Sequence, residues 1–337
     1  MVVDLHPLTI GYKTCHEQYQ LDRLLVHAVL AEKYGFETLW TSDHFHPWAH
    51  TGAAGGFAWV WIASAAEKTN SIKIGTSVTV PILRYHPAIV AQAFATLAYM
   101  YPDRIFLGLG AGEALNESPL GYVWPTPKQR VEMLEEAIII IKKLWSGNFT
   151  TFKGKYYRLK KAKLYTTPKK PIKIYVAAGG PKVAELAGRH ADGILIGPGG
   201  LTKAERLFNA FEEGARKAGR KPELLERVAE LLVSYDEDYE KALKSCRFWC
   251  GSMLPIFFKY DIYDPREIEE HGKLVGDEAL AEKWIIATTA DEHIEAIEKY
   301  VKAGFNHIYF VSSSPDEVKF IKFYGEKVLP YFKQYSK

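Results

Sequence analysis

Short runs of apolar residues alternate along the chain with longer segments in which apolar residues recur every three or four positions. Residues 8–12 form the first run, and a segment of helical spacing follows with Leu21, Leu24, Leu25, Ala28 and Ala31. That segment ends at Gly35, a residue type that commonly terminates helices, and a second apolar run follows at residues 38–41. The same order recurs near the C-terminus, where Gly304 precedes an apolar run at residues 308–311. The pattern therefore predicts alternating strands and helices.

Eight runs of strand length are present, at residues 8–12, 38–41, 72–78, 105–109, 172–177, 193–196, 228–234 and 308–311. Helical patterns separate them, among others at residues 87–100, 128–145, 181–190, 204–218 and 239–249. Nearly continuous apolar strands are typical of parallel strands that are covered on both faces. Eight such strand–helix units predict an α/β fold of the closed (β/α)8 TIM-barrel type, with a doubly wound open sheet as the alternative.

Two connections are longer than ordinary loops. Residues 146–170 have the pattern of a small hairpin, and residues 251–282 are mixed, with Pro255 and Pro265. Long insertions on a barrel more often shape a site or a subunit contact than form separate domains. We expect residues 1–337 to form a single barrel domain with insertions at about 146–170 and 251–282.

Composition narrows the class of protein. Lys and Arg number 43 against 40 Asp and Glu, and the charges are interspersed, which argues against a nucleic-acid partner. No apolar stretch is long enough to span a membrane, and residues 1–12 lack the pattern of a signal peptide. Three cysteines are too few for a disulfide framework. We expect a cytoplasmic protein with no membrane or nucleic-acid partner.

Polar segments follow the predicted strands at their carboxyl ends, where TIM-barrel enzymes carry their sites. Residues 12–17 (YKTCHE) follow the first strand, residues 42–48 (SDHFHPW) the second and residues 110–116 (GAGEALN) the fourth. A histidine at such a position can act as a general acid or base near neutral pH. An isolated Asp43–His44 dipeptide is more often structural. Because this dipeptide is expected on the same rim as Trp48 and Glu113, a catalytic role for it is favoured.

The histidines also raise the question of a metal. His44 and His46 form a His-x-His pair, with His50 nearby, but a metal site needs further converging ligands. The later candidates, His190 and His307, fall at a predicted helix end and a predicted strand start, so they do not point to the same rim. We expect no metal.

Two glycine-rich turns follow adjacent strands, at residues 108–112 (GLGAG) and at Gly179–Gly180. The second opens the helix that begins at Pro181, whose amino-terminal N–H groups suit an anion. Each turn alone is equally compatible with a tight strand–helix connection, and neither is a dinucleotide-binding fingerprint. Together they favour a phosphate or a flat cofactor.

These segments together resemble the coenzyme F420-dependent dehydrogenases, the deazaflavin branch of the bacterial-luciferase-like superfamily. The resemblance runs from residues 10–12 to residues 312–316. It is carried by residues 42–48 (SDHFHPW), 75–78 (GTSV), 84–88 (RYHPA), 91–96 (AQAFAT), 112–117 (GEALNE) and 177–181 (AAGGP). It implies an enzyme that transfers a hydride between the carbinol carbon of an alcohol and C5 of the deazaflavin ring of F420.

The resemblance also implies the roles of individual residues. It puts His44, Glu113, Trp48 and Glu17 around the reacting carbon and assigns proton transfer to His44 and Glu113, without deciding which is the base. The positions implied for F420 binding are Asp43, Ser77, Val78, Val80, Ala111, Gly112, Asn116, Gly179, Gly180, Lys182 and Val183. It further implies a cis peptide bond between Ser77 and Val78.

Two branches of the family compete for the substrate. The branch that oxidises glucose 6-phosphate holds the phosphate with two lysines and one arginine. Lys259 matches one lysine, and Lys283 stands in place of the arginine. The third position falls at the uncharged Gly200, three residues after Gly197, which belongs to the same predicted substrate segment. The second half of the chain, including residues 247–249 (RFW) and 258–260 (FKY), resembles the branch that oxidises small secondary alcohols.

We therefore expect a small secondary alcohol as substrate, with a sugar phosphate as the alternative. An FMN-dependent luciferase-like monooxygenase and a non-enzymatic F420-binding protein are less favoured. We also expect a homodimer.

Overall fold

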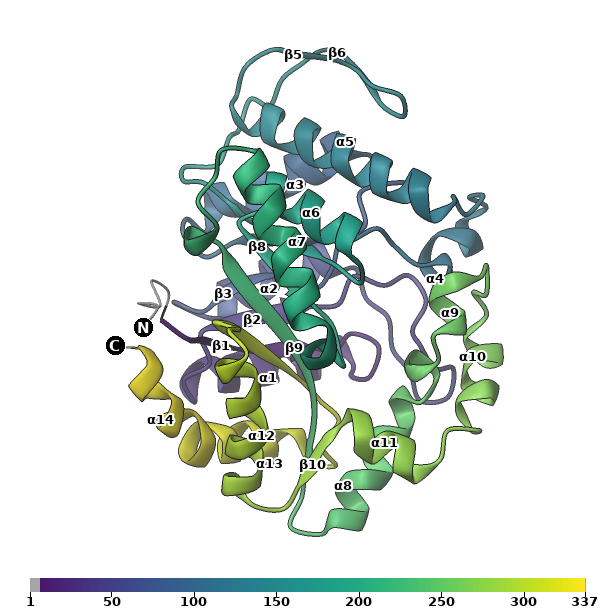
Figure 1. Ribbon diagram of the computed structural model, residues 1–337, viewed down its shortest axis with the longest axis vertical. Coiled ribbons are helices and arrows are strands. Elements are labelled where there is room, and N and C mark those ends of the chain that lie inside the picture. The colour runs from purple at the N-terminus through teal and green to yellow at the C-terminus, as the bar shows by residue number, and fades with distance from the viewer. Residues whose placement is uncertain (1–6, 337) are drawn as a thin grey trace.

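The computed structural model describes residues 7–336, which fold into a nearly closed barrel of parallel strands with helices between them (Figure 1). The barrel strands are β1 (Thr9–Thr14), β2 (Thr38–Thr41), β3 (Lys73–Thr76), β4 (Phe106–Leu109), β7 (Lys173–Ala177), β8 (Gly193–Ile196), β9 (Glu226–Tyr235) and β11 (His307–Ser312). They pair in the order β3-β2-β1-β11-β9-β8-β7-β4. Isolated parallel bridges, Ile74 to Ile105 and Thr79 to Leu109, join the two ends. The predicted barrel and its eight strands are confirmed, and the open-sheet alternative is wrong.

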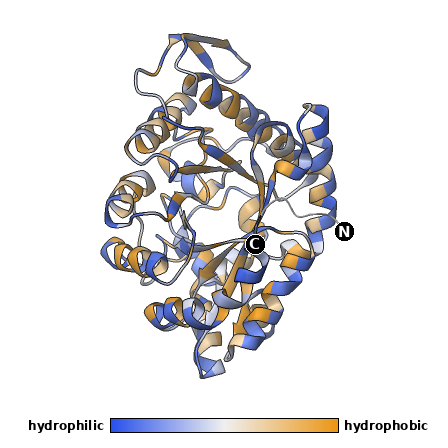
Figure 2. Cartoon of the chain, turned by 90° about the vertical axis from the view of Figure 1, so that its left-hand side faces the viewer, coloured by the Kyte–Doolittle hydropathy of each residue, from blue (hydrophilic) through white to orange (hydrophobic). Residues whose placement is uncertain are grey.

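Helices cover the outside of the barrel. They are α1 (Leu21–Lys33), α2 (Ala58–Lys68), α3 (Pro87–Met100), α5 (Pro127–Trp145), α6 (Pro181–His190), α7 (Ala204–Lys217), α8 (Tyr239–Ser245), α12 (Ala290–Lys302), α13 (Glu317–Phe323) and α14 (Leu329–Phe332), with the short α4 (Ala114–Glu117) on the rim. Their apolar faces turn toward the strands, as the colouring in Figure 2 shows. Capping boxes at Thr126 and Thr289 set the starts of α5 and α12. Within the described residues, no helix combines the length and apolarity needed to cross a membrane.

Both insertions extend the barrel. In the first, β5 (Thr150–Lys153) and β6 (Arg158–Ala162) form the expected antiparallel hairpin, seen at the top of Figure 1. The second carries α9 (Ile256–Lys259), α10 (Pro265–Gly272) and α11 (Asp277–Lys283). It ends in the short strand β10 (Ile285–Ala287), which pairs with the end of β9 and was not predicted.

The inside of the barrel has an aromatic floor. It consists of Trp40, Phe106, Tyr175, Leu195, Val228 and Tyr309, all buried. The Trp40 and Tyr309 rings stack with centroids 4.5 Å apart. Because side chains on one face of a strand recur every second residue, Glu230 follows Val228 toward the carboxyl end of β9.

Candidate active site

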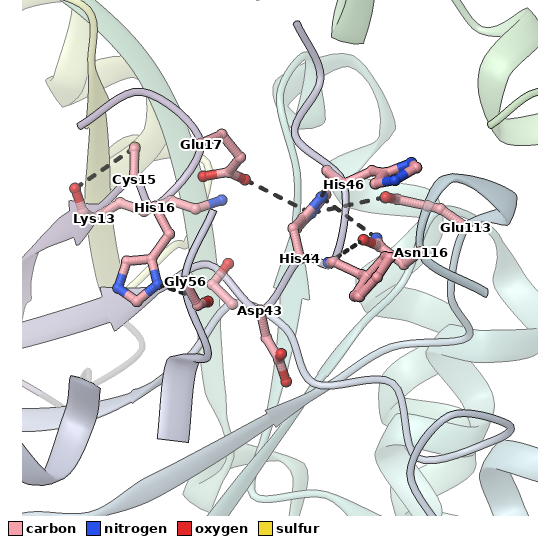
Figure 3. A network of polar contacts seen from close by, with 12 residues as sticks. Lys13, Cys15, His16, Glu17, Asp43, His44, His46, Gly56, Glu113 and Asn116 are labelled. Atoms are coloured by element: carbon pink, nitrogen blue, oxygen red, sulfur yellow. Dashed lines mark hydrogen bonds and ion pairs between the residues drawn. The ribbon is translucent and has the colours of Figure 1, made fainter. Parts of the chain in front are cut away.

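His44 lies between two carboxylates at the carboxyl rim. Its Nε2 is 3.7 Å from Oε1 of Glu17, which follows β1, and 3.9 Å from Oε2 of Glu113, which follows β4. Figure 3 shows the two carboxylates on opposite sides of the imidazole. The structure therefore brings together three residues that come from three different strand ends.

The other imidazole nitrogen fixes the orientation of the ring. Nδ1 of His44 is 3.2 Å from the His46 carbonyl oxygen and 3.4 Å from the Asn116 amide nitrogen. Asn116 in turn accepts a hydrogen bond from the Phe45 N–H at 2.7 Å. When Nδ1 is the protonated nitrogen, its N–H donates to the His46 carbonyl. Nε2 can then exchange a proton on the side of the carboxylates.

The two carboxylates have different electrostatic surroundings. Burial by itself raises the pKa of Glu17, which is 2% exposed, but His44 and Lys13 more than offset this and hold that pKa below its ordinary value. Burial raises the pKa of Glu113, and the nearby Glu17 raises it further, against the opposing effect of His44 and Lys13. Oε2 of each carboxyl is buried without a hydrogen-bond partner. Two carboxyls with pKa values pushed apart suit different roles in proton transfer.

Asp43 points away from this group (Figure 3). Its carboxylate accepts hydrogen bonds from the Thr79 hydroxyl at 2.6 Å and the Tyr85 hydroxyl at 3.0 Å, and Nη2 of Arg84 lies 3.3 Å away. Arg84 also meets Glu117, whose Oε2 accepts its backbone N–H at 2.8 Å. Burial raises the pKa of Glu117 to about 7. The sequence pattern did not indicate this cluster, which holds the segment that carries His44.

The backbone beside the rim is open at three glycines, where an anionic group could approach it. An ideal Cβ at Gly179, Gly180 or Gly197 would meet no atom within 4 Å, so the backbone there faces open space. Gly180 is the N-cap of α6 and gives no side-chain cap, which leaves the first N–H groups of that helix available to a ligand. Lys182 is exposed on the same turn, with Val183 half-buried next to it.

The remaining positions predicted for the cofactor lie around β3 and β4. The Ser77–Val78 peptide bond is cis, as the family resemblance implied, and the Ser77 hydroxyl is 2.7 Å from that of Tyr309. Gly112 has φ +83°, a conformation that favours glycine. Its neighbour Ala111 is half-buried, and an ideal Cβ on Gly112 would lie 2.7 Å from Val80.

An apolar wall closes the site on the side of the second insertion. The Trp48 ring lies 5.9 Å from the His44 ring and 5.1 Å from the Phe258 ring, measured between centroids. Trp48 is buried in a cluster with Trp249, Met253, Phe257 and Trp284. The sequence pattern gave Phe258 no role of its own.

The positions predicted for phosphate are occupied by two lysines and a glycine. Lys259 is exposed on α9, which packs against α4, whereas Lys283 donates to the Met253 carbonyl at 3.0 Å. An ideal Cβ on Gly200 would lie 2.6 Å from Ile196, so no side chain fits there without movement.

His190 and His307 bond to Glu135 and Glu226 at 3.0 Å each and do not join His44. Within residues 7–336, no group of three His, Cys, Asp or Glu is placed to hold a metal ion.

A barrel whose rim combines a histidine between two carboxylates with an open glycine turn suits an enzyme that uses acid–base chemistry beside an anionic ligand. The family model described as luciferase-like monooxygenase matches residues 6–307. The chain therefore belongs to the luciferase-like family.

Relatives with names are similar over nearly the whole chain. An F420-dependent glucose-6-phosphate dehydrogenase of Nakamurella multipartita is 40% identical over 326 residues, covering 96% of each chain. The enzyme of that name from Mycobacterium tuberculosis is 41% identical over 327 residues, covering 96% of this chain and 97% of the relative.

Among solved structures, one of an F420-dependent secondary alcohol dehydrogenase in complex with an F420–acetone adduct is also similar. It has a TM-score of 0.93 and 42% identity, and the match covers 96% of this chain and 98% of that one. The two kinds of relative are about equally similar to this chain.

We expect Asp43→Asn to lower the free energy of unfolding by about 2 kcal/mol, because it removes one of the two carboxylates paired with the buried Arg84 guanidinium. Tyr85→Phe removes one hydrogen bond and keeps the ion pair, so it should cost about 1 kcal/mol. Urea unfolding followed by circular dichroism measures both values. An Asp43→Asn variant as stable as the wild type would contradict this role of Asp43.

Proposed function

We propose that this protein oxidises a small secondary alcohol to the ketone with coenzyme F420 as hydride acceptor. It is an F420-dependent oxidoreductase that acts on CH–OH groups. The observation that carries the choice of substrate class is the apolar wall of Trp48 and Phe258 beside His44.

The residues present fit F420. The open backbone at Gly179 and Gly180, with the N–H groups at the start of α6 and the Lys182 side chain, suits the anionic side chain of the cofactor. Val78, Ala111 and Gly112 line the neighbouring part of the rim, where a flat ring fits against backbone. Bound there, F420 supplies the hydride acceptor, which is chemistry that no protein side chain offers.

His44 and Glu113 carry the proton. When a secondary alcohol gives up the hydrogen on its carbinol carbon as a hydride, its hydroxyl proton must pass to a base. Nε2 of His44 and Oε2 of Glu113, 3.9 Å apart, both lie where they can receive that proton. Glu17, whose charged form is favoured, lies on the other side of the imidazole, 3.7 Å from Nε2.

Electrostatics supports a neutral substrate. A phosphate monoester carries close to two negative charges at neutral pH, and a pocket that excludes water must match them. Lys259 and Lys283 offer two positive charges at most, Lys283 is already bonded to the Met253 carbonyl, and Gly200 offers none. A small alcohol needs only the apolar wall and the polar groups at His44. The structural relative with an F420–acetone adduct binds the ketone that corresponds to isopropanol.

A sugar phosphate is the second candidate. Relatives about 41% identical to this chain are named as glucose-6-phosphate dehydrogenases, and Lys259 and Lys283 stand where a phosphate would need positive charge. Lys203, exposed three residues beyond Gly200, is a further cation within that region of the chain. The two candidates differ in charge, so a single comparison separates them.

We expect His44→Ala and Glu113→Gln each to lower kcat about 100-fold, since each removes a group that handles the proton. F420 affinity, measured by fluorescence titration, should stay within about twofold, because neither side chain belongs to the glycine turn that holds the anion. Glu295→Gln on the outer face of α12 serves as the control and should match the wild type. Wild-type kcat in both variants would refute the assignment.

We expect kcat/KM to be higher for isopropanol than for glucose 6-phosphate, and Lys259→Ala to change the isopropanol value little. Absorbance of oxidised F420, which is lost on reduction, measures both rates. The opposite result, a preference for the phosphate that collapses in Lys259→Ala, would establish the sugar phosphate as substrate.

We also propose a cytoplasmic homodimer. Val26 and Val29 on α1 and Val60 on the neighbouring α2 expose apolar side chains to the outside, as a subunit contact requires. The three cysteines are free and buried, which suits a reducing compartment. Light scattering should give about twice the chain mass of 38.1 kDa for the wild type, and Val60→Glu should reduce it. A wild-type mass of one chain would contradict the dimer.

A further inference from the structure

Lys13 is a buried cation inside the barrel that none of the steps above uses. It lies on β1 and is 11% exposed, and its Nζ donates a hydrogen bond to Oε2 of Glu230 on β9 at 2.8 Å. The same oxygen accepts the Tyr309 hydroxyl at 2.6 Å and lies 3.3 Å from the Ser77 hydroxyl. Donors from β1, from β11 and from the segment after β3 therefore fix one carboxylate oxygen, between the aromatic floor and the rim.

The turn after β1 brings Glu17 back toward this cation. The Gln18 and Tyr19 N–H groups both donate to the Cys15 carbonyl, so the chain reverses directly after the strand. Figure 3 shows Lys13 and Glu17 on one side of His44 and Glu113 on the other. Among the charges that favour ionised Glu17, Lys13 ranks directly after His44. At Glu113, the opposing effects of Lys13 and Glu230 are both felt.

We propose that Lys13 is a positioning residue for proton transfer: its charge, held in place by Glu230, keeps Glu17 as the permanent anion of the site and leaves Glu113 as the carboxyl that exchanges the proton. This inference rests on the dehydrogenase function proposed above. It explains why a lysine is buried in a barrel that already encloses three carboxylates, Glu17, Glu113 and Glu230.

The groups around Glu17 determine the direction in which the loss of Lys13 should move its pKa. Burial disfavours its charged form, and His44, Lys13 and the nearby Ser42 favour it. His16 and Cys15 are close in the same turn, and burial keeps each of them neutral, since it lowers the pKa of His16 and raises that of Cys15. Apart from His44, Lys13 is the cationic side chain that most favours ionised Glu17. Its loss should therefore raise the pKa of Glu17.

The test compares Lys13→Met with Glu230→Gln. Both break the same ion pair, so damage to the fold would affect them alike. The proposal expects opposite electrostatic results. Lys13→Met should move the titration of Glu17 upward by about one pH unit or more, as is typical when a close opposite charge is lost. Glu230→Gln frees the Lys13 charge from its partner and should leave that titration unchanged or move it downward.

Two readouts follow the titration. In the protein without cofactor, the ¹³C carboxyl resonance of Glu17, identified by its loss in Glu17→Gln, reports its ionisation directly. In the protein with F420, the acidic limb of the kcat–pH profile should move upward in Lys13→Met by the same amount, with a smaller change in kcat on the plateau. Lys13→Arg keeps the charge and should restore both readouts.

The outcomes separate this inference from the proposed function. An unshifted Glu17 titration in Lys13→Met, or equal shifts in Lys13→Met and Glu230→Gln, would overturn the role of Lys13. A wild-type protein with F420 that oxidises neither isopropanol nor glucose 6-phosphate would overturn the function instead, while the carboxyl titration still tests Lys13. If Lys13→Met does not fold, Lys13→Gln, which can still donate to Glu230, carries the same expectation.

Discussion

Closure of the barrel brings the carboxyl ends of all its parallel strands to one rim, and the chemistry of this protein depends on that convergence. Glu17, His44 and Glu113 follow β1, β2 and β4, and only the ring of strands puts both carboxylates within 4 Å of Nε2 of His44. The aromatic floor closes the barrel below them, so their charges sit above a layer of buried side chains. In such surroundings a nearby charge acts strongly on its neighbours.

Charge is arranged in two connected layers above that floor. The lower layer is the Lys13–Glu230 pair with its hydroxyl donors, and the upper layer is His44 between its two carboxylates. Lys13 favours the charged form of both carboxyls, but burial and the charges of Glu17 and Glu230 oppose it at Glu113, so two carboxyls of the same residue type have pKa values displaced in opposite directions. Difference in surroundings, and not in residue type, thus gives the two glutamates different roles.

The Asp43 cluster supports this arrangement from behind. Thr79, Arg84 and Tyr85 hold the Asp43 carboxylate, while Asn116 holds the backbone of Phe45 on the other side of His44. The imidazole is therefore fixed from both flanks, although neither flank takes part in proton transfer. A histidine placed in this way keeps Nε2 facing its partners without an entropic cost at each turnover.

The sequence by itself determined the eight strands, the rim segments and the family, because each rests on residues that are near one another in the chain. Its apolar runs predict strands since parallel strands are buried on both faces. It missed α2, a mostly apolar helix without a clear polar face, and β10, whose three residues are a strand only because β9 lies beside them. Lys13 and Glu230 are 217 residues apart, so only the folded barrel makes them a pair. The tertiary structure likewise decided the different surroundings of Glu17 and Glu113, because a carboxyl's pKa depends on distance and burial, which no spacing along the chain records.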